Sequence, residues 1–446
     1  MPLNNQQVFE AVEELKAQRS TDIARLDRIR NYLRDDPDRR SLEGLPAGTP
    51  IEMQRLARLS RVNMLKFVVN SRVQSMYVDG FRAPKADSDV DTWAVWQANG
   101  MDARQIGVHR AALSYGAAYV TVLPGDTAPV IRGASPRNLT VVYGDDDLWP
   151  ELALEKRRSR SGQLWRLIDD EAVYWVRYPA GSDRPDDTVE VENHDAGRVP
   201  VVRYSDTNDL DDPTTGIVEP FIPLQDQINM TTFDLLVAQH YGAFKQRWII
   251  GWLAESEEKR LKASASTLFT VDESPTDVQI GEWAETNLDG YIKSREATLK
   301  HLATVSQTPA HELIGEMVNI SADALVAAES SKQRAIEENK RVIGEAHEQT
   351  LNLAGEMIGV VPDSEAFVRW QDSEARSLAQ TVDALGKAVS LLGIPPQALW
   401  DRVADAMGVS QQEVEGWRAM AQSGDAFAGL EQMLRDQAEP PAEPAA

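Results

Sequence analysis

Hydrophobic residues recur at three- and four-residue spacings over the first quarter of the chain, which is the pattern of amphipathic helices. Residues 4–33 follow this spacing, and Pro37 is expected to end that helix. Two further helical stretches are predicted over residues 53–78 and 87–115. The N-terminal part is therefore predicted to be helical.

The hydrophobic period changes to two between residues 117 and 205, and turn residues become frequent. Alternation of this kind, interrupted by turn residues, is typical of antiparallel strands. Eight strands are predicted, at residues 118–123, 130–132, 139–143, 152–156, 164–168, 172–177, 189–191 and 201–204.

Long helices return after residue 213. Residues 220–243 and 287–305 are each predicted to be helical, and they bracket three short β-rich segments at 247–252, 267–272 and 278–283. Ser321 is a favourable N-cap for the longest helix, which extends to about residue 358. Such a helix is roughly 57 Å long, at 1.5 Å per residue.

The C-terminal part contains shorter elements. Helices are predicted at residues 374–392, 396–407 and 410–421. Residues 423–446 are rich in Ala, Glu and Pro and are predicted to be a disordered tail. The element order therefore predicts an α+β chain with a helical C-terminal part.

Length and composition narrow the class of protein. A chain of 446 residues exceeds what one hydrophobic core usually serves, so two to four structural regions are expected. The longest stretch without a charged residue is 111–125, fifteen residues, which is short of the roughly 20 that a membrane span needs. No secretory signal is expected at the N-terminus. The absence of cysteine excludes disulfides, thiolate metal sites and cysteine nucleophiles.

Charge bears on nucleic-acid binding. The chain has 70 acidic and 46 basic residues, a net charge of −24. Tight binding to DNA without sequence preference depends on many Lys and Arg contacts to phosphates, which this balance disfavours. An acidic protein that handles DNA is expected to guide it with little attraction.

The usual catalytic motifs are absent from the sequence. It contains neither a phosphate-binding loop of the form GxxxxGK[ST] nor a GxSxG elbow. His311-Glu312 resembles the start of a zinc-protease helix, but Gly315 stands where the second histidine belongs, and His347-Glu348 fails at Leu351. We therefore expect no enzymatic activity, no cofactor and no metal.

The remaining candidates have simpler interpretations. The triple acid at 145–147 is predicted to be a solvated turn in preference to an ion site. His109 and His301 have no ligand-spaced partners and are expected at the surface or at an interface. The tryptophans are expected to pack in cores or interfaces in preference to stacking on nucleobases.

The two bracketing helices leave apolar faces that one chain is not expected to cover. A closed ring of identical subunits, joined by head-to-tail contacts, would cover them.

Several segments together resemble the portal proteins of tailed bacteriophages, in particular those of siphophages that infect actinobacteria. The resemblance covers nearly the whole chain and depends on the joint order of its segments, since no single one is diagnostic. These segments are Asn63 with Val68-Val69, residues 78–82 (VDGFR), 93–99 (WAVWQAN), 112–120 (ALSYGAAYV), 223–229 (PLQDQIN), 247–251 (RWIIG), 306–309 (SQTP) and 319–325 (NISADAL).

The resemblance implies a layout for the chain. Its parts would be a wing of N-terminal helices and antiparallel sheet (1–215), a first stem helix (216–243), a small α/β clip (244–286), a second stem helix (287–305), a tunnel loop (306–320), a long wing helix (321–361), helical crown (362–422) and disordered tail (423–446).

The resemblance also implies a function and partners. Portal proteins are rings of twelve subunits at one capsid vertex, and double-stranded DNA passes through them during packaging and ejection without sequence recognition. The implied partners are other copies of the chain, the major capsid and scaffolding proteins, the terminase large subunit at the clip, and later the head–tail adaptors. ATP hydrolysis belongs to the terminase, which agrees with the missing phosphate-binding loop. The implied location is the virion, and the host cytoplasm during assembly.

The net charge of the predicted stem, clip and tunnel loop agrees with a channel for DNA. Residues 216–320 have a net charge of −7, or −84 in twelve copies, so that DNA would slide along a wall of similar charge. The candidate DNA-facing residues are Glu312, Glu316 and Asn319 in the tunnel loop and Lys293, Arg295 and Lys300 on the second stem helix. The three bases have an alternative interpretation as ion pairs with Asp289 and Glu296. The alternative interpretation of the tunnel loop is an ordinary solvent-facing connection between two helices.

Two other classes of protein stay open at this point. A head–tail adaptor or minor capsid protein is a structural alternative, although such chains are usually shorter and lack the bracketed clip. A metal-dependent nuclease is permitted by the excess of acids but supported by no motif.

Overall fold

The computed structural model describes residues 2–34, 45–83, 89–144, 148–160, 162–182, 184–211, 215–242, 247–250, 279–282, 287–315, 322–371, 378–400, 402–403, 413–414 and 416–421. Within these ranges the chain combines helices with antiparallel sheets, as expected. None of the described helices is both long and apolar enough to cross a bilayer.

The N-terminal helix α1 (Asn5–Leu33) forms as predicted. The Asn4 side chain accepts a hydrogen bond from the Gln7 backbone and the Gln7 side chain accepts one from the Asn4 backbone, which is a capping box. The first half of α1 packs on the five-stranded sheet through Val8, Val12 and Leu15, and its end enters the main core.

Two predicted long helices are each broken in the structure. The stretch 53–78 is α3 (Ile51–Leu59), α4 (Met64–Val73) and the strand β1 (Val78–Arg82). The stretch 87–115 is α5 (Asp89–Ala98) and α6 (Met101–Tyr115). Gly100, at φ 59°, lies in the left-handed region between α5 and α6, where an α-helix cannot continue.

The eight predicted strands are all present within a residue or two of their expected bounds, and they divide between two sheets. The three-stranded sheet has the order β3 (Val130–Ala134), β2 (Ala117–Leu123), β9 (Val201–Ser205). The five-stranded sheet runs in sequence order through β4 (Leu139–Tyr143), β5 (Pro150–Arg157), β6 (Gly162–Ile168), β7 (Ala172–Pro179) and β8 (Glu190–Asn193). A small apolar cluster fills the space between them.

A third sheet was not predicted. β1 pairs antiparallel with β12 (Phe367–Trp370), almost 300 residues away in the chain. Asp79 accepts two hydrogen bonds from Arg369 across this pair, at 2.9 and 3.1 Å. The range 362–422, assigned to a helical crown with helices from residue 374, therefore also contains a strand, which the sequence did not indicate because a four-residue strand paired with a distant partner carries no local signal.

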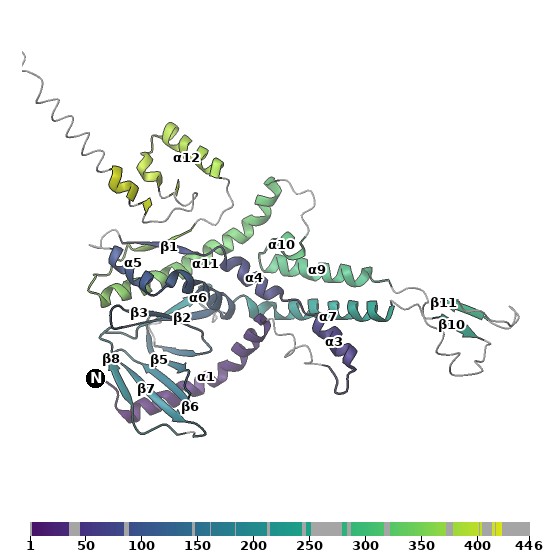
Figure 1. Cartoon of the computed structure of the whole chain (residues 1–446), viewed down its shortest axis with the longest axis horizontal. Coiled ribbons are helices and arrows are strands. Elements are labelled where there is room, and N and C mark those ends of the chain that lie inside the picture. Colours follow the sequence, from purple (N-terminus) through teal and green to yellow (C-terminus); the bar gives the residue numbers. More distant parts are fainter. Residues whose placement is uncertain are drawn as a thin grey trace, which may run out of the picture.

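Two helices project side by side from the body, α7 (Val218–Gly242) and α9 (Asp289–Val305), and the β10–β11 pair lies beyond their far ends (Figure 1). The strands β10 (Arg247–Ile250) and β11 (Gln279–Glu282) are antiparallel. Residues 267–272, predicted to be a further strand, lie outside the described ranges.

The long helix α11 (Ala322–Met357) ends within a residue of its predicted end at 358, and it crosses the body (Figure 1). It joins α4, α5, α6, β2 and β9 in the main core. Its expected cap, Ser321, lies outside the described residues. The C-terminal elements are α12 (Leu378–Leu392) and a short 3₁₀ helix (Pro396–Leu399). In Figure 1, α12 lies above β1, on the upper side of the body.

Candidate functional site at the base of the helix pair

The base of the helix pair is where α9 ends and the chain turns toward α11. The helix ends at Val305, as Pro309 predicts, and Gln307 adopts a left-handed conformation at φ 52°. A short helix follows, α10 (Ala310–Ile314), which Gly315 terminates at φ 77°. The described part of the predicted tunnel loop is thus a folded corner, and Leu313 anchors it in the main core.

Arg72 connects this corner to the body. Its side chain is 8% exposed, and its Nη2 donates to the Ser306 carbonyl oxygen at 2.6 Å. A cation at the C-terminal end of α9 also complements the helix dipole. The same guanidinium is 3.4 Å from Asn339 Oδ1 on α11, and Asn339 Nδ2 donates to the Asp206 carbonyl at 2.6 Å. One buried cation therefore links α4, α9, α11 and the end of β9.

Asp206 is the acidic member of this group. Burial raises the pKa of its carboxyl to about 6, against the opposing effects of backbone hydrogen bonds and of Arg72. Its Oδ1 is buried and has no hydrogen-bond partner within the described residues. Burial also lowers the pKa of Arg72 from its usual value. Both shifts show that the base of the helix pair is poorly hydrated.

Glu312 is held in place by neighbouring side chains. Its carboxylate accepts hydrogen bonds from Lys332 Nζ on α11, at 2.7 and 3.0 Å, and from Ser71 Oγ on α4 at 3.0 Å. The two ionic side chains are 14% and 21% exposed. Glu312 thus connects α10 to two elements of the body. The candidates Glu316 and Asn319 lie outside the described residues.

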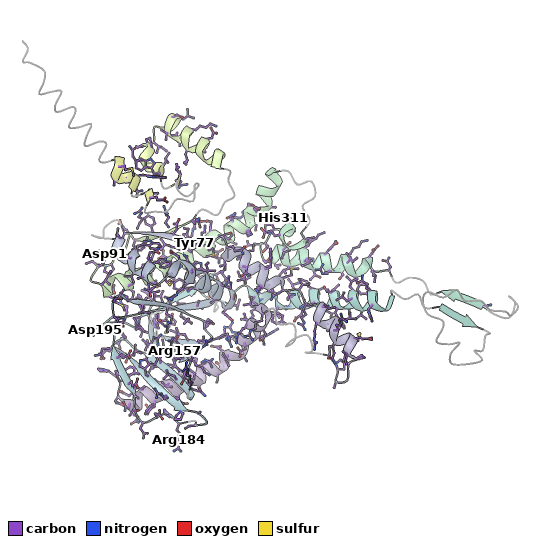
Figure 2. The ribbon with its side chains drawn as sticks, in the orientation of Figure 1. Tyr77, Asp91, Arg157, Arg184, Asp195 and His311 are labelled. Atoms are coloured by element: carbon purple, nitrogen blue, oxygen red, sulfur yellow. The ribbon has the colours of Figure 1, made fainter. Side chains whose placement is uncertain are left out.

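His311, Glu312 and Glu329 place three potential metal-ligand atoms within 4.8 Å of one another. This group lies where α10 meets α11, at the labelled His311 in Figure 2. However, Lys332 Nζ already contacts both oxygens of Glu312 and supplies the compensating charge there. The geometry therefore favours an ion pair over a metal site.

The segment 223–229, part of the resemblance, connects three elements. Gln225 on α7 accepts hydrogen bonds from the Met64 and Leu65 backbone at the start of α4, at 2.9 and 3.3 Å. The Tyr32 hydroxyl of α1 donates its hydrogen to the Asp226 carboxylate and lies 2.8 and 2.6 Å from its two oxygens. These contacts fix the direction in which α7 leaves the body.

His109 and His347 form a buried pair that the sequence did not indicate. Both are 0% exposed, and their Nε2 atoms are 2.7 Å apart. The expectation that His109 lies at a surface is wrong, because α11 covers it with a residue 238 positions away. His301 is exposed, as expected.

The hydrogen bonds of this pair define one tautomer for each ring. His109 Nδ1 must donate to the Met76 carbonyl at 3.2 Å, so its Nε2 accepts from His347 Nε2. His347 Nδ1 then accepts from the Tyr204 hydroxyl at 3.1 Å. Burial lowers the pKa of His109 to about 4, and burial followed by the His109 charge holds that of His347 well below 6.5. Both rings are neutral near pH 7.

The three basic candidates lie along α9. Lys293 and Lys300 are exposed, and they share one face because they are two helical turns apart. Arg295 is half-buried, with an Nε that has no partner within the described residues. In the described part of the chain none of the three pairs with Asp289 or Glu296, so the alternative interpretation as ion pairs is not observed. Residues 145–147, the possible ion site, lie outside the described ranges.

Comparisons with known proteins agree on a family. The family model described as phage portal protein, SPP1 Gp6-like, matches residues 12–425. The portal protein of Mycobacterium phage D29 is 24% identical over 84% of this chain and 81% of its own length. That of Mycobacterium phage L5 is 24% identical over 86% and 82%.

Solved structures were compared as well. A chain of the virion of a native gene transfer agent particle covers 79% of this chain and 96% of its own, at 13% identity and a TM-score of 0.45. A chain from the neck of an empty gene transfer agent particle covers 79% and 93%, at 14% identity and a TM-score of 0.49.

Proposed function

This chain belongs to the SPP1 Gp6-like family of phage portal proteins, and from that membership we propose that twelve copies close into a ring at one vertex of a phage capsid. The ring is the channel for double-stranded DNA during packaging and ejection. The match over residues 12–425 favours this function over a head–tail adaptor or minor capsid protein. The observation that carries the proposal is the pair α7 and α9, which extends from the body (Figure 1) and has apolar side chains that one chain leaves exposed or half-buried.

The apolar positions of the pair support assembly. Met230 on α7 is 68% exposed and Ile292 on α9 is 44% exposed. Four residues of α7 are only half-buried: Phe233, Leu235, Leu236 and Val237. Exposed apolar surface of this extent along two helices is typical of an interface. Repeated head-to-tail contacts between neighbouring subunits close a ring if the rotation between them closes.

The layout follows the family resemblance with one change. Residues 1–215 form the wing, α7 and α9 the stem, 244–286 the clip, 306–320 the tunnel loop and α11 the long wing helix. The crown begins after β12, because this strand pairs with β1 inside the body. The proposed partners are the capsid and scaffolding proteins, the terminase large subunit at the clip, and the head–tail adaptors that replace it. The terminase hydrolyses ATP, and the portal has a structural role in the virion.

We place the narrowest point of the channel at the tunnel loop. In this proposal Glu316 and Asn319 face the DNA, whereas Glu312 holds the base of the loop, because its carboxylate is already bound by Lys332 and Ser71. Lys293 and Lys300 give the acidic stem scattered positive contacts to passing phosphates.

Assembly is tested first. Native mass spectrometry and negative-stain microscopy of the purified protein are expected to show closed rings. Met230→Glu combined with Ile292→Glu is expected to shift the population toward monomers, because it places charges in the proposed interface. Gln239→Glu adds a charge at an exposed polar position of α7 and serves as the matched control. A wild-type protein that stays monomeric at micromolar concentration contradicts the proposal.

A further inference from the structure

A cavity of about 260 Å³ lies in the wing between the three-stranded and the five-stranded sheet. Its lining includes Thr121 and Arg132 from the first sheet, and Arg157, Arg166 and Trp175 from the second. Arg157 is labelled in the strand-rich part of the body in Figure 2. Three guanidinium groups around one small cavity are unusual in a chain whose net charge is −24.

Among the described residues, one buried carboxylate compensates these charges. Glu155 is 5% exposed, and it is the cross-strand partner of Arg166. Its Oε2 lies 2.7 Å from Arg166 Nη2, and its Oε1 lies 3.1 Å from Arg157 Nη1. Each carboxylate oxygen thus lies within ion-pair distance of a guanidinium, although Oε2 accepts no hydrogen bond within the described residues, and two guanidinium groups share one negative charge.

Two buried donors of the cavity have no hydrogen-bond partner within the described residues. Arg166 is 6% exposed, yet its Nε has no hydrogen-bond partner within the described residues. The indole Nε1 of Trp175, the cross-strand neighbour of Arg166, is buried and unpartnered in the same part of the chain. Buried donors without acceptors each cost about 1–3 kcal/mol, and native structures seldom leave them so.

Arg132 adds a third positive charge from the opposite sheet. It is exposed, and its guanidinium makes neither a hydrogen bond nor an ion pair with any residue that the structure describes, whereas its backbone carbonyl accepts a hydrogen bond from Thr121 Oγ1 at 3.4 Å. An acid that does line the cavity, Glu192, is exposed on β8, so it is hydrated by solvent. Burial lowers the pKa of Arg166 from its usual value, and Arg157 and Arg132 act in the same direction.

We propose that this cavity is a binding site for a small oxyanion of the phosphate or carboxylate class, held by Arg132, Arg157, Arg166 and Trp175. An oxyanion accepts hydrogen bonds without donating them in its ionised form, which matches a lining that has spare donors and excess positive charge. By contacting residues of both sheets, the anion would join the two halves of the wing. The site is independent of the channel, so the proposed function does not depend on it.

Inorganic phosphate is the probe. At pH 7.5, 20 mM phosphate is expected to raise the thermal midpoint of the whole protein by about 2–4 °C relative to sodium chloride of equal ionic strength. A ³¹P line-width titration gives the affinity directly. Arg132→Gln is expected to weaken phosphate binding about tenfold or more, because it removes one charge-assisted contact. Its midpoint without phosphate should stay close to that of the wild type, since the Arg132 guanidinium has no described partner to lose.

Arg158→Gln is the matched control, because Arg158 is an exposed arginine just after β5 that does not line the cavity. It should bind phosphate like the wild type. Equal responses to phosphate and chloride, or equal binding by Arg132→Gln and wild type, would overturn the proposal. If the anion is instead an acidic side chain of a second copy, phosphate stabilises only the unassembled protein and the assembled ring shows no shift. Phosphate-specific stabilisation of the assembled ring itself therefore identifies a free anion.

Discussion

The body and the helix pair of this protein are stabilised in different ways. The body encloses several of its largest side chains completely, among them Trp96, Tyr204 and Met101, and Tyr204 finds hydrogen-bond partners inside it. The helix pair has Met230 and Ile292 exposed and much of α7 half-buried. The body is thus complete in one chain, whereas in the proposed ring the helix pair is completed by other copies. At the base of the helix pair, Arg72 and Glu312 connect the two regions through hydrogen bonds and an ion pair.

The largest expected difference between the two regions is the loss of stability when a large apolar side chain is removed from each. Trp96→Ala is expected to cost about 3–5 kcal/mol, because Trp96 is fully buried and stacks on Trp93 with 5.3 Å between ring centroids. Met230→Ala in the helix pair should change the stability of the unassembled chain by less than about 0.5 kcal/mol. Chemical unfolding below the concentration of assembly measures both. Similar losses for the two variants would show that the regions do not differ.

The connection between the regions is tested at Arg72. Arg72→Met is expected to destabilise the protein by about 2–3 kcal/mol, because it leaves the Ser306 carbonyl without its charged donor and Asp206 without its nearest cation. Arg334→Gln, at an exposed position of α11, is the control and should be nearly neutral. Hydrogen exchange should show faster opening at the end of α9 in Arg72→Met alone. Unaltered exchange there would mean that Arg72 does not hold the corner.

The histidine pair gives the body a pH dependence. Since the folded pKa of each ring lies below the unfolded value of about 6.5, the unfolded state binds more protons and stability falls as the pH decreases from 6.5 toward 4. Each histidine contributes up to about 1.4 kcal/mol per pH unit. The raised pKa of Asp206 acts in the opposite sense, because its contribution to stability is lost as the pH rises through about 6.

A histidine variant separates the contribution of the histidine pair to this pH dependence from that of Asp206. His109→Gln keeps a donor for Met76 and an acceptor for His347, and it is expected to remove one histidine's share of the slope between pH 6.5 and 4. His301→Gln changes an exposed histidine of α9 and should leave the slope intact. Thermal midpoints across this pH range measure the difference. A slope in His109→Gln equal to that of the wild type contradicts the assigned protonation state.

The smallest effect is expected at Glu312. Glu312→Gln weakens a partly buried ion pair with Lys332 and should cost about 1 kcal/mol, with rings still forming. The control Glu337→Gln affects an ion pair with Lys340 in which Glu337 is 59% exposed, and should cost less than about 0.5 kcal/mol. Packaged DNA length in phage particles is expected to change with Glu316→Gln and much less with Glu312→Gln. The reverse order would place Glu312 in the channel.

Local sequence patterns determined much of this fold. Alternation in period two located all eight strands between residues 117 and 205, and apolar spacing located α1, α7, α9 and α11. The stop before Pro309 and the end of α10 at Gly315 were also predictable, because proline restricts the backbone of the residue before it and glycine readily adopts the left-handed conformation that ends a helix. The Asn99-Gly100 break carries a turn signal, although helical spacing continues on both sides of it.

The tertiary structure decided what depends on distant partners. The pairing of β1 with β12, the contact between His109 and His347, and the ion pair of Glu312 with Lys332 each join separate parts of the chain. The start of α4 depends in the same way on Gln225 of α7. A histidine or a glutamate has the same local sequence whether it is buried or exposed, and only packing sets its neighbours, its hydration and its charge. For this reason the elements could be predicted from the sequence, whereas the corner at the base of the helix pair could not.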